Sequence, residues 1–317
     1  MHVPRYSVIV PVYNRPHEVE ELLASLTQQT YKNFEVLLVE DGSTQTSMEV
    51  YEHYSSVLNI TYFFKPNSGP GPSRNFGFER ARGAYFVVFD SDCVIPETYF
   101  ESVEKFMQSQ PADAWGGPDR GRADFTPLQQ AMAYTMASVL TTGGIRGGKK
   151  NGFQPRSFNM GISRQVFEQT KGFVFDRFAE DIELSIRMRK LKFKVVLIPD
   201  AFVYHKRRAT LHDFFKQVSN FGKGRVLVGQ VHPGEIKITH WFPAIFLAGL
   251  CAIPVLLLLV PQAGVSLLAG YVLYFLLIGF HSWSTIKSSY IAVLSIPSAF
   301  VQLTGYGFGF LKQLAKR

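Results

Sequence analysis

Two long stretches without charged side chains constrain the fold of this chain most strongly. Residues 238–286 contain no Asp, Glu, Lys or Arg over 49 positions, and residues 288–311 contain none over a further 24. A helix needs about 20 apolar residues to cross a bilayer. The first stretch therefore predicts two membrane spans, at about 241–261 and 264–283, and the second predicts a third hydrophobic segment. These lengths exclude an entirely soluble protein.

The chain as a whole has the composition of a folded protein. Of the 317 residues, 46% are hydrophobic and 18% are charged, which suffices to bury a core. The cysteines Cys93 and Cys251 are too few for a disulfide framework, and the apolar run at 6–12 is too short for a secretion signal. We therefore expect the residues before the apolar stretches to face the cytoplasm.

Positive charge is concentrated just before the apolar stretches. The formal net charge is +8, and residues 185–225 hold eleven Lys and Arg against Asp200 and Asp213. Basic residues beside a span favour the cytoplasmic face and anionic lipids, and no nucleic-acid-binding module is recognisable. We predict a multi-pass protein of the cytoplasmic (inner) membrane that contacts lipids and no nucleic acid, with an amphipathic interface helix within 209–237.

The first part of the chain alternates between apolar runs and amphipathic segments. The predicted strands are 6–12, 34–39, 60–64 and 84–89, and the predicted helices are 18–29, 47–54, 72–81 and 97–108. Further on we expect loops at 115–118 and 143–150, strands at 157–163 and 193–199, and helices at 165–169, 179–190 and 209–228. This alternation predicts an α/β domain over 1–208 with a mostly parallel sheet and helices on both faces.

Polar clusters follow the predicted strands, and parallel sheets bind ligands beyond the carboxyl ends of their strands. Asp90-Ser91-Asp92 comes directly after the strand at 84–89. Two carboxylates there can hold Mg²⁺ or Mn²⁺ against phosphate oxygens. The same residues can instead cap the backbone N–H groups of a turn.

Asp41 and Arg74 occupy two other such positions. Asp41 can accept a hydrogen bond from a nucleobase or ribose, or it can form an Asx-turn or a helix cap. Arg74 lies in the segment 67–75, which enters a helix and can therefore meet an anion with its backbone N–H groups. Glycine and proline in this segment also fit an ordinary loop.

Glu180-Asp181 begins a predicted helix, where the macrodipole stabilises acidic residues. An aspartate exposed to an acceptor can also act as a general base. His205 follows the region 196–204 and can bind a metal or a diphosphate, or serve a structural role.

In their order along the chain, these motifs resemble those of the inverting family 2 glycosyltransferases with the GT-A fold. The matching residues are Pro11 to Asn14, Glu40 to Ser43, Gly69 to Gly77 with Ser73 in place of the usual Ala, Asp90 to Asp92, and Glu180-Asp181 within 172–187. The resemblance covers about residues 6–228 and implies a Rossmann-like GT-A domain.

The resemblance implies a metal-dependent transfer from a nucleotide-diphosphate sugar to a hydroxyl of a lipid-linked or glycan acceptor. Asp181 is the expected general base, and the cofactor is Mg²⁺ or Mn²⁺. Donor-binding residues are expected at Pro11, Tyr13, Asn14, Asp41, Arg74, Asp90 and Glu180. The resemblance implies metal ligands at Asp90 and Asp92, and the position of His205 after 196–204 adds it as a third expected ligand. A single displacement by the acceptor then inverts the anomeric centre.

Three alternatives remain beside this interpretation. Processive polysaccharide synthases of the family carry Gln-x-x-Arg-Trp, whereas this chain has Gln217-Val-Ser-Asn220-Phe221, which favours transfer of one sugar. A sugar nucleotidyltransferase needs a glycine loop near its N-terminus, and the turn at 11–14 has no glycine. A nucleotide-binding membrane pore or scaffold is disfavoured because the apolar stretches offer no charged ion path.

The third hydrophobic segment conflicts with the charge bias. After two spans Lys287 returns to the cytoplasm, so a third crossing would place Lys312, Lys316 and Arg317 outside. Pro297 also weakens the segment as a straight helix. We therefore expect residues 288–311 to lie in or re-enter the cytoplasmic leaflet, where a lipid-linked acceptor would approach.

Overall fold

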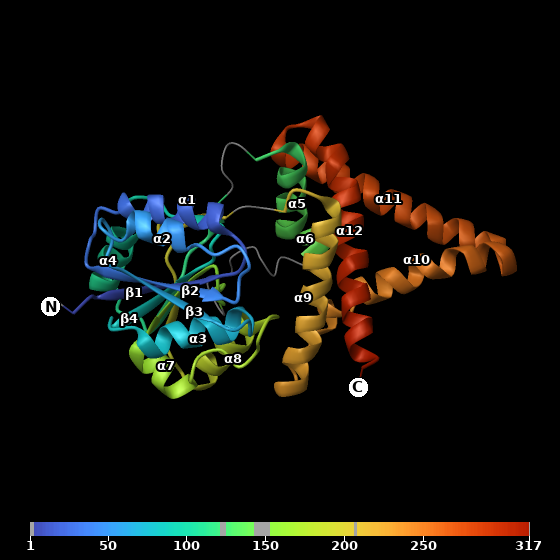
Figure 1. Ribbon diagram of the computed structural model, residues 1–317. Helices are drawn as coiled ribbons and strands as arrows, with labels where there is room; N and C mark the ends of the chain where they lie inside the picture. The colour runs from blue at the N-terminus through green and yellow to red at the C-terminus, as the bar shows by residue number, and fades with distance from the viewer. Residues whose placement is uncertain (1–2, 121–124, 143–152, 206–207, 317) are drawn as a thin grey trace. The chain divides into compact units, whose positions relative to one another are not determined.

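The chain forms two compact units in a computed structural model that describes residues 3–120, 125–142, 153–205 and 208–316 (Figure 1). The sheet unit comprises residues 1–122 and 150–206, and the helical unit comprises residues 123–149 and 207–317. The sequence predicts one continuous domain over 1–208, whereas this division places the segment 123–149 with the C-terminal helices.

The sheet unit contains strands and helices in alternation. Its strands are β1 (Tyr6–Val12), β2 (Phe34–Asp41), β3 (Ile60–Lys65), β4 (Tyr85–Phe89), β5 (Cys93–Val94), β6 (Ala114–Gly116), β7 (Asp119–Arg120), β8 (Asn159–Ser163), β9 (Val195–Leu197) and β10 (Val203–His205). Its helices are α1 (Pro16–Thr27), α2 (Met48–Tyr54), α3 (Pro70–Arg80), α4 (Tyr99–Ser109), α7 (Arg164–Thr170) and α8 (Glu180–Lys190).

Seven strands form the main sheet in the order β3-β2-β1-β4-β8-β6-β9. All neighbouring pairs are parallel except the two that involve β8. A small second sheet has the order β5-β10-β7. The predicted mostly parallel α/β sheet is therefore confirmed.

Helices cover both faces of the main sheet (Figure 1), as the apolar strands require. On one face α1 buries Val19, Leu22, Leu23 and Leu26, the three-and-four spacing of one helical stripe, in the same core cluster as α4. On the other face α3, α7 and α8 share a second core cluster. The two layers leave the carboxyl ends of β1, β2 and β4 at one edge.

The predicted loop at 115–118 is wrong, because β6 covers its first two residues. Trp115 is fully buried, and Gly161 of the neighbouring strand β8 makes room for its ring: a Cβ there would lie 2.1 Å from Trp115 Cε2. A glycine on one strand thus allows a tryptophan on the next. The other predicted loop, at 143–150, lies outside the described residues.

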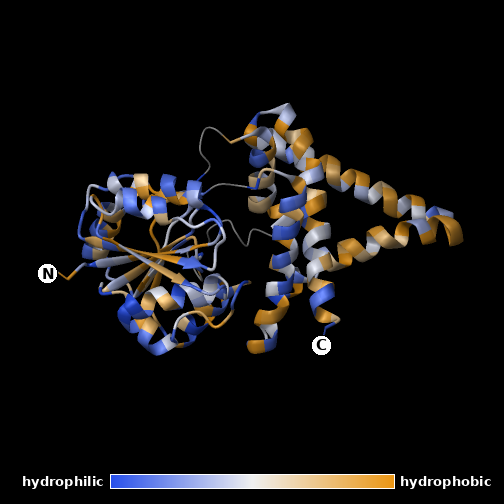
Figure 2. Ribbon diagram, in the orientation of Figure 1, coloured by the Kyte–Doolittle hydropathy of each residue, from blue (hydrophilic) through white to orange (hydrophobic). Residues whose placement is uncertain are grey.

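The helical unit contains the apolar stretches. Its helices are α5 (Pro127–Ala137), α6 (Val139–Thr142), α9 (Leu211–Val231), the 3₁₀ turn η1 (Ile238–His240), α10 (Phe242–Leu259), α11 (Pro261–Ile286) and α12 (Ser289–Leu314). Three helical segments, at 238–259, 261–286 and 289–314, are long and apolar enough to cross a membrane. Figure 2 shows this apolar character along α10 and α11, while α9 mixes hydrophobic and hydrophilic residues.

Helices α5 and α6 were not predicted from the sequence. Their segment has no strong helical periodicity, and α5 is stabilised by contacts within the helical unit. Met132 and Met136 of α5 pack against Phe214 and Val218 of α9 in one buried cluster. Such contacts with residues far along the chain outweigh local propensity.

Candidate active site

The motif residues gather at one edge of the main sheet. Asp41 is the last residue of β2, Tyr13 and Asn14 follow β1, and Asp90 follows β4. Because β1, β2 and β4 are parallel, their carboxyl ends share an edge. The sheet therefore brings together side chains that lie far apart in the sequence.

Arg74 joins two of the motifs. Its Nη2 donates to Asp90 Oδ1 at 2.8 Å and its Nη1 donates to Glu180 Oε1 at 2.8 Å. Arg74 is only 2% exposed. Burial by itself lowers the pKa of Arg74, but the two carboxylates outweigh it and raise the pKa, so the guanidinium stays charged. One buried cation thus holds the Asp-x-Asp and Glu-Asp motifs together.

The segment before α8 is held against the start of α3, which explains how Glu180 reaches Arg74. A Cβ on Gly71 would lie 2.1 Å from the backbone oxygen of Phe175, so only glycine permits this approach. Arg74 also lies over the ring of Phe173, 5.3 Å from its centroid. The contacts fix the first residue of α8 beside the end of β4.

Glu180 and Asp181 have different surroundings. Burial raises the pKa of Glu180 and Asp181 adds to this, although Arg74 acts in the opposite direction. Asp181 is partly exposed: Oδ1 accepts from the N–H of Ile182 at 2.8 Å, and Oδ2 lies 3.6 Å from Nη1 of Arg156. Glu180 is therefore committed to Arg74, whereas the carboxylate of Asp181 remains partly exposed.

Asp41 binds the loop that leads into α3. Its carboxylate accepts hydrogen bonds from Nζ of Lys65, from the N–H of Ser68 at 2.9 Å and from the N–H of Gly69 at 2.8 Å. Burial alone would raise the pKa of Asp41, but these donors outweigh it and hold the pKa below its usual value. The side chain thus shapes the loop directly.

Asp41→Asn should lower the free energy of unfolding by about 1.5–3 kcal/mol at neutral pH, because a charged acceptor of several hydrogen bonds is lost. A lowered carboxylate pKa stabilises the fold above the ordinary pKa, and this contribution is lost as the pH falls through the folded-state pKa. The difference from wild type should therefore shrink below about pH 4. Thermal unfolding followed by tryptophan fluorescence in detergent measures it.

Asp200→Asn is the matched control, because Asp200 is an exposed carboxylate of the same unit. It should change stability by less than about 0.5 kcal/mol. An Asp41→Asn difference that is equally large at low and neutral pH would contradict the assignment of its effect to the carboxylate charge.

The turn after β1 is ordered by Asn14. Its Oδ1 accepts from the backbone N–H groups of Thr44 and Gln45 at 2.8 and 2.9 Å, and its φ of 54° lies in the left-handed region that asparagine tolerates. Tyr13 is 52% exposed, and Pro11 is partly buried within β1. Of these residues Tyr13 presents a ring to solvent, while Asn14 joins the ends of β1 and β2.

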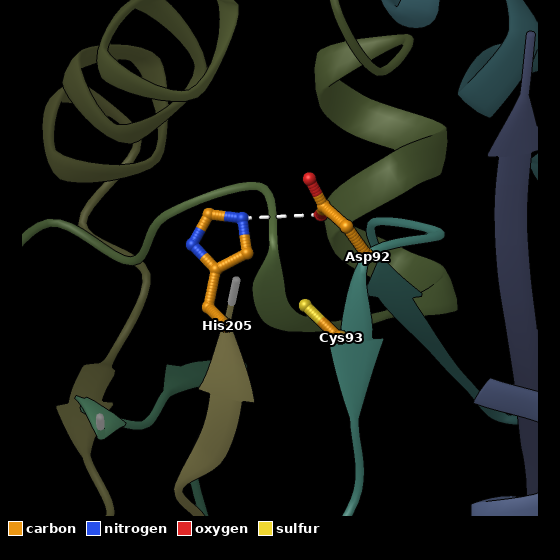
Figure 3. A group of neighbouring side chains, drawn as sticks. All are labelled: Asp92, Cys93 and His205. Atoms are coloured by element: carbon orange, nitrogen blue, oxygen red, sulfur yellow. Dashed lines mark ion pairs between the residues drawn. The ribbon is translucent and has the colours of Figure 1, made fainter. Parts of the chain in front are cut away.

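Asp92, Cys93 and His205 form a second group, and their ligand atoms all lie within 4.8 Å of one another (Figure 3). His205 Nε2 is 3.1 Å from Asp92 Oδ1, and Arg15 Nη1 donates to Asp92 Oδ2 at 2.8 Å. Among the described residues this group does not include Asp90, which is bonded to Arg74. The structure therefore brings two of the three predicted metal ligands together, along with a thiol.

Three residues of this region were not singled out from the sequence: Arg15, Cys93 and Arg156. Arg15 belongs to the turn at 13–16 and Cys93 directly follows the Asp-x-Asp motif, so their positions in the sequence could have identified them as site residues. No sequence motif points to Arg156. Its contact with Asp181 depends on the path of the chain just before β8, which only the structure shows.

The comparisons with known proteins agree with this architecture. Residues 7–171 match the family model of Glycosyl transferase family 2. An uncharacterized glycosyltransferase of Rickettsia felis is 40% identical over 108 residues, 34% of this chain and 18% of that protein. The uncharacterized glycosyltransferase EpsJ of Bacillus subtilis is 25% identical over 218 residues, 66% of this chain and 63% of that protein. The chain covers less than half the length of the first curated relatives it matches.

Solved structures share the fold. The mannosyltransferase PcManGT of Pyrobaculum calidifontis, solved with GDP-Man and Mn²⁺, superposes with a TM-score of 0.68 at 16% identity, over 96% of this chain and 88% of that one. S. aureus TarS 1-349, solved with UDP-GlcNAc, gives 0.51 at 19% identity, over 99% and 92%. The sheet unit is therefore a GT-A-like α/β domain. The chain belongs to glycosyl transferase family 2.

Proposed function

We propose that this protein is a membrane-bound inverting glycosyltransferase that moves one sugar from a nucleotide-diphosphate sugar to a hydroxyl of a lipid-linked or glycan acceptor. The observation that carries the proposal is the buried Arg74, whose two hydrogen bonds join Asp90 to Glu180. Through it, Asp90, a proposed ligand of the metal that faces the diphosphate, and Asp181, the neighbour of Glu180 and the proposed base, belong to one site. The nucleotide sugars bound by PcManGT and TarS support the donor class.

Asp181 is the general base in this proposal. It accepts the proton of the acceptor hydroxyl as the oxygen attacks the anomeric carbon, and the bond from that carbon to the diphosphate breaks in the same displacement. The N–H of Ile182 fixes the orientation of its carboxylate. Glu180 supports it by anchoring the first turn of α8 to Arg74.

The donor's nucleoside would lie at the ends of β1 and β2. Tyr13 offers an exposed ring on which a base can stack, and Asn14 and Asp41 hold the two loops that frame this position. An N–H group of the base would share Asp41 with Lys65. Pro11 sets the end of β1 in this arrangement, and Arg74 supports the nucleotide through Asp90.

The side chains at the end of β4 include oxygen and nitrogen ligands suited to a divalent cation. Asp92 is 7% exposed and its Oδ1 lies 3.1 Å from an imidazole nitrogen of His205, a spacing that one ion can bridge. Asp90, Asp92 and His205 would hold Mg²⁺ or Mn²⁺, which when bound offsets the charge of the departing nucleoside diphosphate. The Mn²⁺ of PcManGT supports this choice.

Incubating the purified full chain with a panel of nucleotide sugars and a membrane lipid extract, and measuring nucleoside diphosphate release, tests the function. One donor should give release that stops in EDTA and returns with added Mn²⁺ or Mg²⁺. Asp92→Asn should release at least about tenfold less, since a charged ligand is lost. Full turnover in EDTA would contradict the metal assignment, and no release from any donor would contradict the function.

The helix α12 supports the proposal that the third hydrophobic segment does not cross the membrane completely. Within its most apolar window 56% of residues are buried inside the protein, against 22% for the first segment and 11% for the second. Its backbone touches α9: a Cβ on Gly309 would lie 2.0 Å from Ser219 O, and one on Gly222 would lie 2.2 Å from Tyr306 O. Protein rather than lipid therefore surrounds much of α12.

Helix α9 is poorly suited to the hydrocarbon core. It carries Asp213, Lys216, Lys223 and Arg225, and each such charge costs about 2.5–3.5 kcal/mol at the centre of a spanning helix. A complete crossing by α12 would draw its close partner α9 into the bilayer. We propose that both helices lie at the cytoplasmic leaflet, with α10 and α11 as the spans.

Cysteine labelling tests this arrangement in a background that carries Cys93→Ser and Cys251→Ser. Ala315→Cys, just after α12, should escape a membrane-impermeant maleimide in intact cells and react after permeabilisation. Gln262→Cys, in the first turn of α11, is the control and should react in intact cells. Labelling of Ala315→Cys in intact cells would show three complete crossings instead.

A further inference from the structure

The thiol of Cys93 lies in the group formed with Asp92 and His205. Strands β5 and β10 are antiparallel and place Cys93 directly opposite His205, so both side chains leave the same face of the pair. Figure 3 shows Asp92 and Cys93 on the same side of the imidazole ring of His205, with a carboxylate oxygen of Asp92 facing a ring nitrogen. The ring of His205 is held in place by stacking on Phe158, at 4.7 Å between centroids.

The spacing of the three ligand atoms is close to that around one tetrahedral ion. With bond lengths of about 2.3 Å to sulfur and 2.0–2.2 Å to nitrogen and oxygen, neighbouring ligands lie about 3.3–3.6 Å apart. His205 Nε2 and Asp92 Oδ1 are 3.1 Å apart, and all three ligand atoms lie within 4.8 Å of one another. Side-chain shifts of about an ångström would bring the three atoms to these distances, and a water molecule would take the fourth position.

A thiolate, an imidazole and a carboxylate are ligands typical of zinc rather than magnesium. Thiolates bind soft and borderline ions such as Cd²⁺ and Zn²⁺, whereas Mg²⁺ and Mn²⁺ favour oxygen. Arg15 Nη1 donates to Oδ2 of Asp92 at 2.8 Å, whereas the carboxylate oxygen nearest His205 Nε2 is Oδ1, at 3.1 Å. The buried sulfur of Cys93 is thus the ligand that favours a thiophilic ion over Mg²⁺ or Mn²⁺ in this group.

We propose that Asp92, Cys93 and His205 form a binding site for a thiophilic divalent cation, Zn²⁺ or Cd²⁺, with the sulfur of Cys93 as a ligand. The metal–sulfur bond forms as the thiol releases its proton to solvent. The ion takes Asp92 and His205 and therefore excludes Mg²⁺ or Mn²⁺ from them, so it inhibits. The inhibition rests on the proposed function, whereas the binding does not.

Cadmium binding to the metal-stripped full chain in detergent tests the site without any sugar transfer. Wild type should develop the ultraviolet sulfur-to-cadmium charge-transfer absorption and saturate at one ion per chain. Cys251→Ser, which removes the exposed cysteine of α10, should behave as wild type. Cys93→Ser should lose the absorption and bind at least about tenfold more weakly.

His205→Gln keeps the thiol and provides a second, independent variant. It should retain the absorption but require about 10- to 100-fold more Cd²⁺ to saturate. Absorption of equal strength in Cys93→Ser, its absence from wild type, or unchanged affinity in His205→Gln would overturn the site.

A competition experiment tests the exclusion. Mn²⁺ bound to wild type, followed by its electron paramagnetic resonance signal, should be displaced by stoichiometric Zn²⁺, and in Cys93→Ser displacement should need at least about tenfold more. Zn²⁺ bound together with retained Mn²⁺ would overturn the exclusion. Failure of the proposed function would appear separately, as absent diphosphate release in a chain that still shows the cadmium absorption.

Discussion

The Asp181→Asn variant is expected to lose about 10²- to 10⁴-fold in kcat for sugar transfer. Its dissociation constant for the nucleotide sugar should change by less than about threefold, because a general base acts on the acceptor and not on the donor. Asparagine has nearly the same size and can still accept the N–H of Ile182, which Asp181 accepts at 2.8 Å. Initial rates and calorimetric titration with the donor measure the two effects separately.

Asp176→Asn is the matched control for this experiment. Asp176 is an exposed carboxylate in the segment that leads to α8, and its replacement should leave both quantities unchanged. An unaltered transfer rate in Asp181→Asn would reduce Asp181 to a residue that stabilises the start of α8. A matching loss of donor affinity would place its action on the donor instead.

The Arg74→Met variant should be destabilised by about 3–5 kcal/mol, the usual effect of removing one partner from a buried ion pair. Glu180 is 7% exposed and would be left without its cation. Asp90 is about one-third exposed at its side chain and contributes less. Chemical unfolding in detergent, followed by fluorescence, measures the loss, and diphosphate release should fall with it.

Two variants make this result specific to the Arg74 pairs. Arg80→Met changes an arginine on the same helix whose partner Glu79 is exposed, so it should cost less than about 1 kcal/mol. Glu180→Gln combined with Arg74→Met should recover part of the loss, because the uncompensated buried charge is gone. Additive losses in the double variant would contradict a direct interaction between the two side chains.

The first four strands were predictable because they are short apolar runs that stop at polar turns. All seven residues of β1 are buried or partly buried, and β2 is buried throughout. Their sequences are therefore nearly continuous apolar runs, which is typical of strands in a parallel sheet covered on both faces. Strand β6 was missed since its Trp115-Gly116 sequence is typical of a loop. Its formation depends on Gly161, a residue whose significance appears only when β8 is paired with β6.

The candidate site was predictable in position but not in its contacts. The parallel sheet determines that Asp41 and Asp90 lie at one edge, whereas the partners of Asp41 on the loop at 65–69 depend on the path of that loop. The pairing of Cys93 with His205 likewise requires the antiparallel contact of β5 and β10. Hydrogen bonds between distant segments are set by tertiary structure, which a pattern of residue types does not encode.

The central claim is that Asp181 acts as the base in a single displacement, at the site that Arg74 holds together. The anomeric configuration of the sugar in the first product tests this claim most directly. Once the panel has identified the donor, proton NMR of the transferred sugar at early reaction times gives its anomeric configuration. We predict the configuration opposite to that of the donor. Retention would require two displacements and a covalent or equivalent intermediate, which would contradict Asp181 as the base of a direct attack.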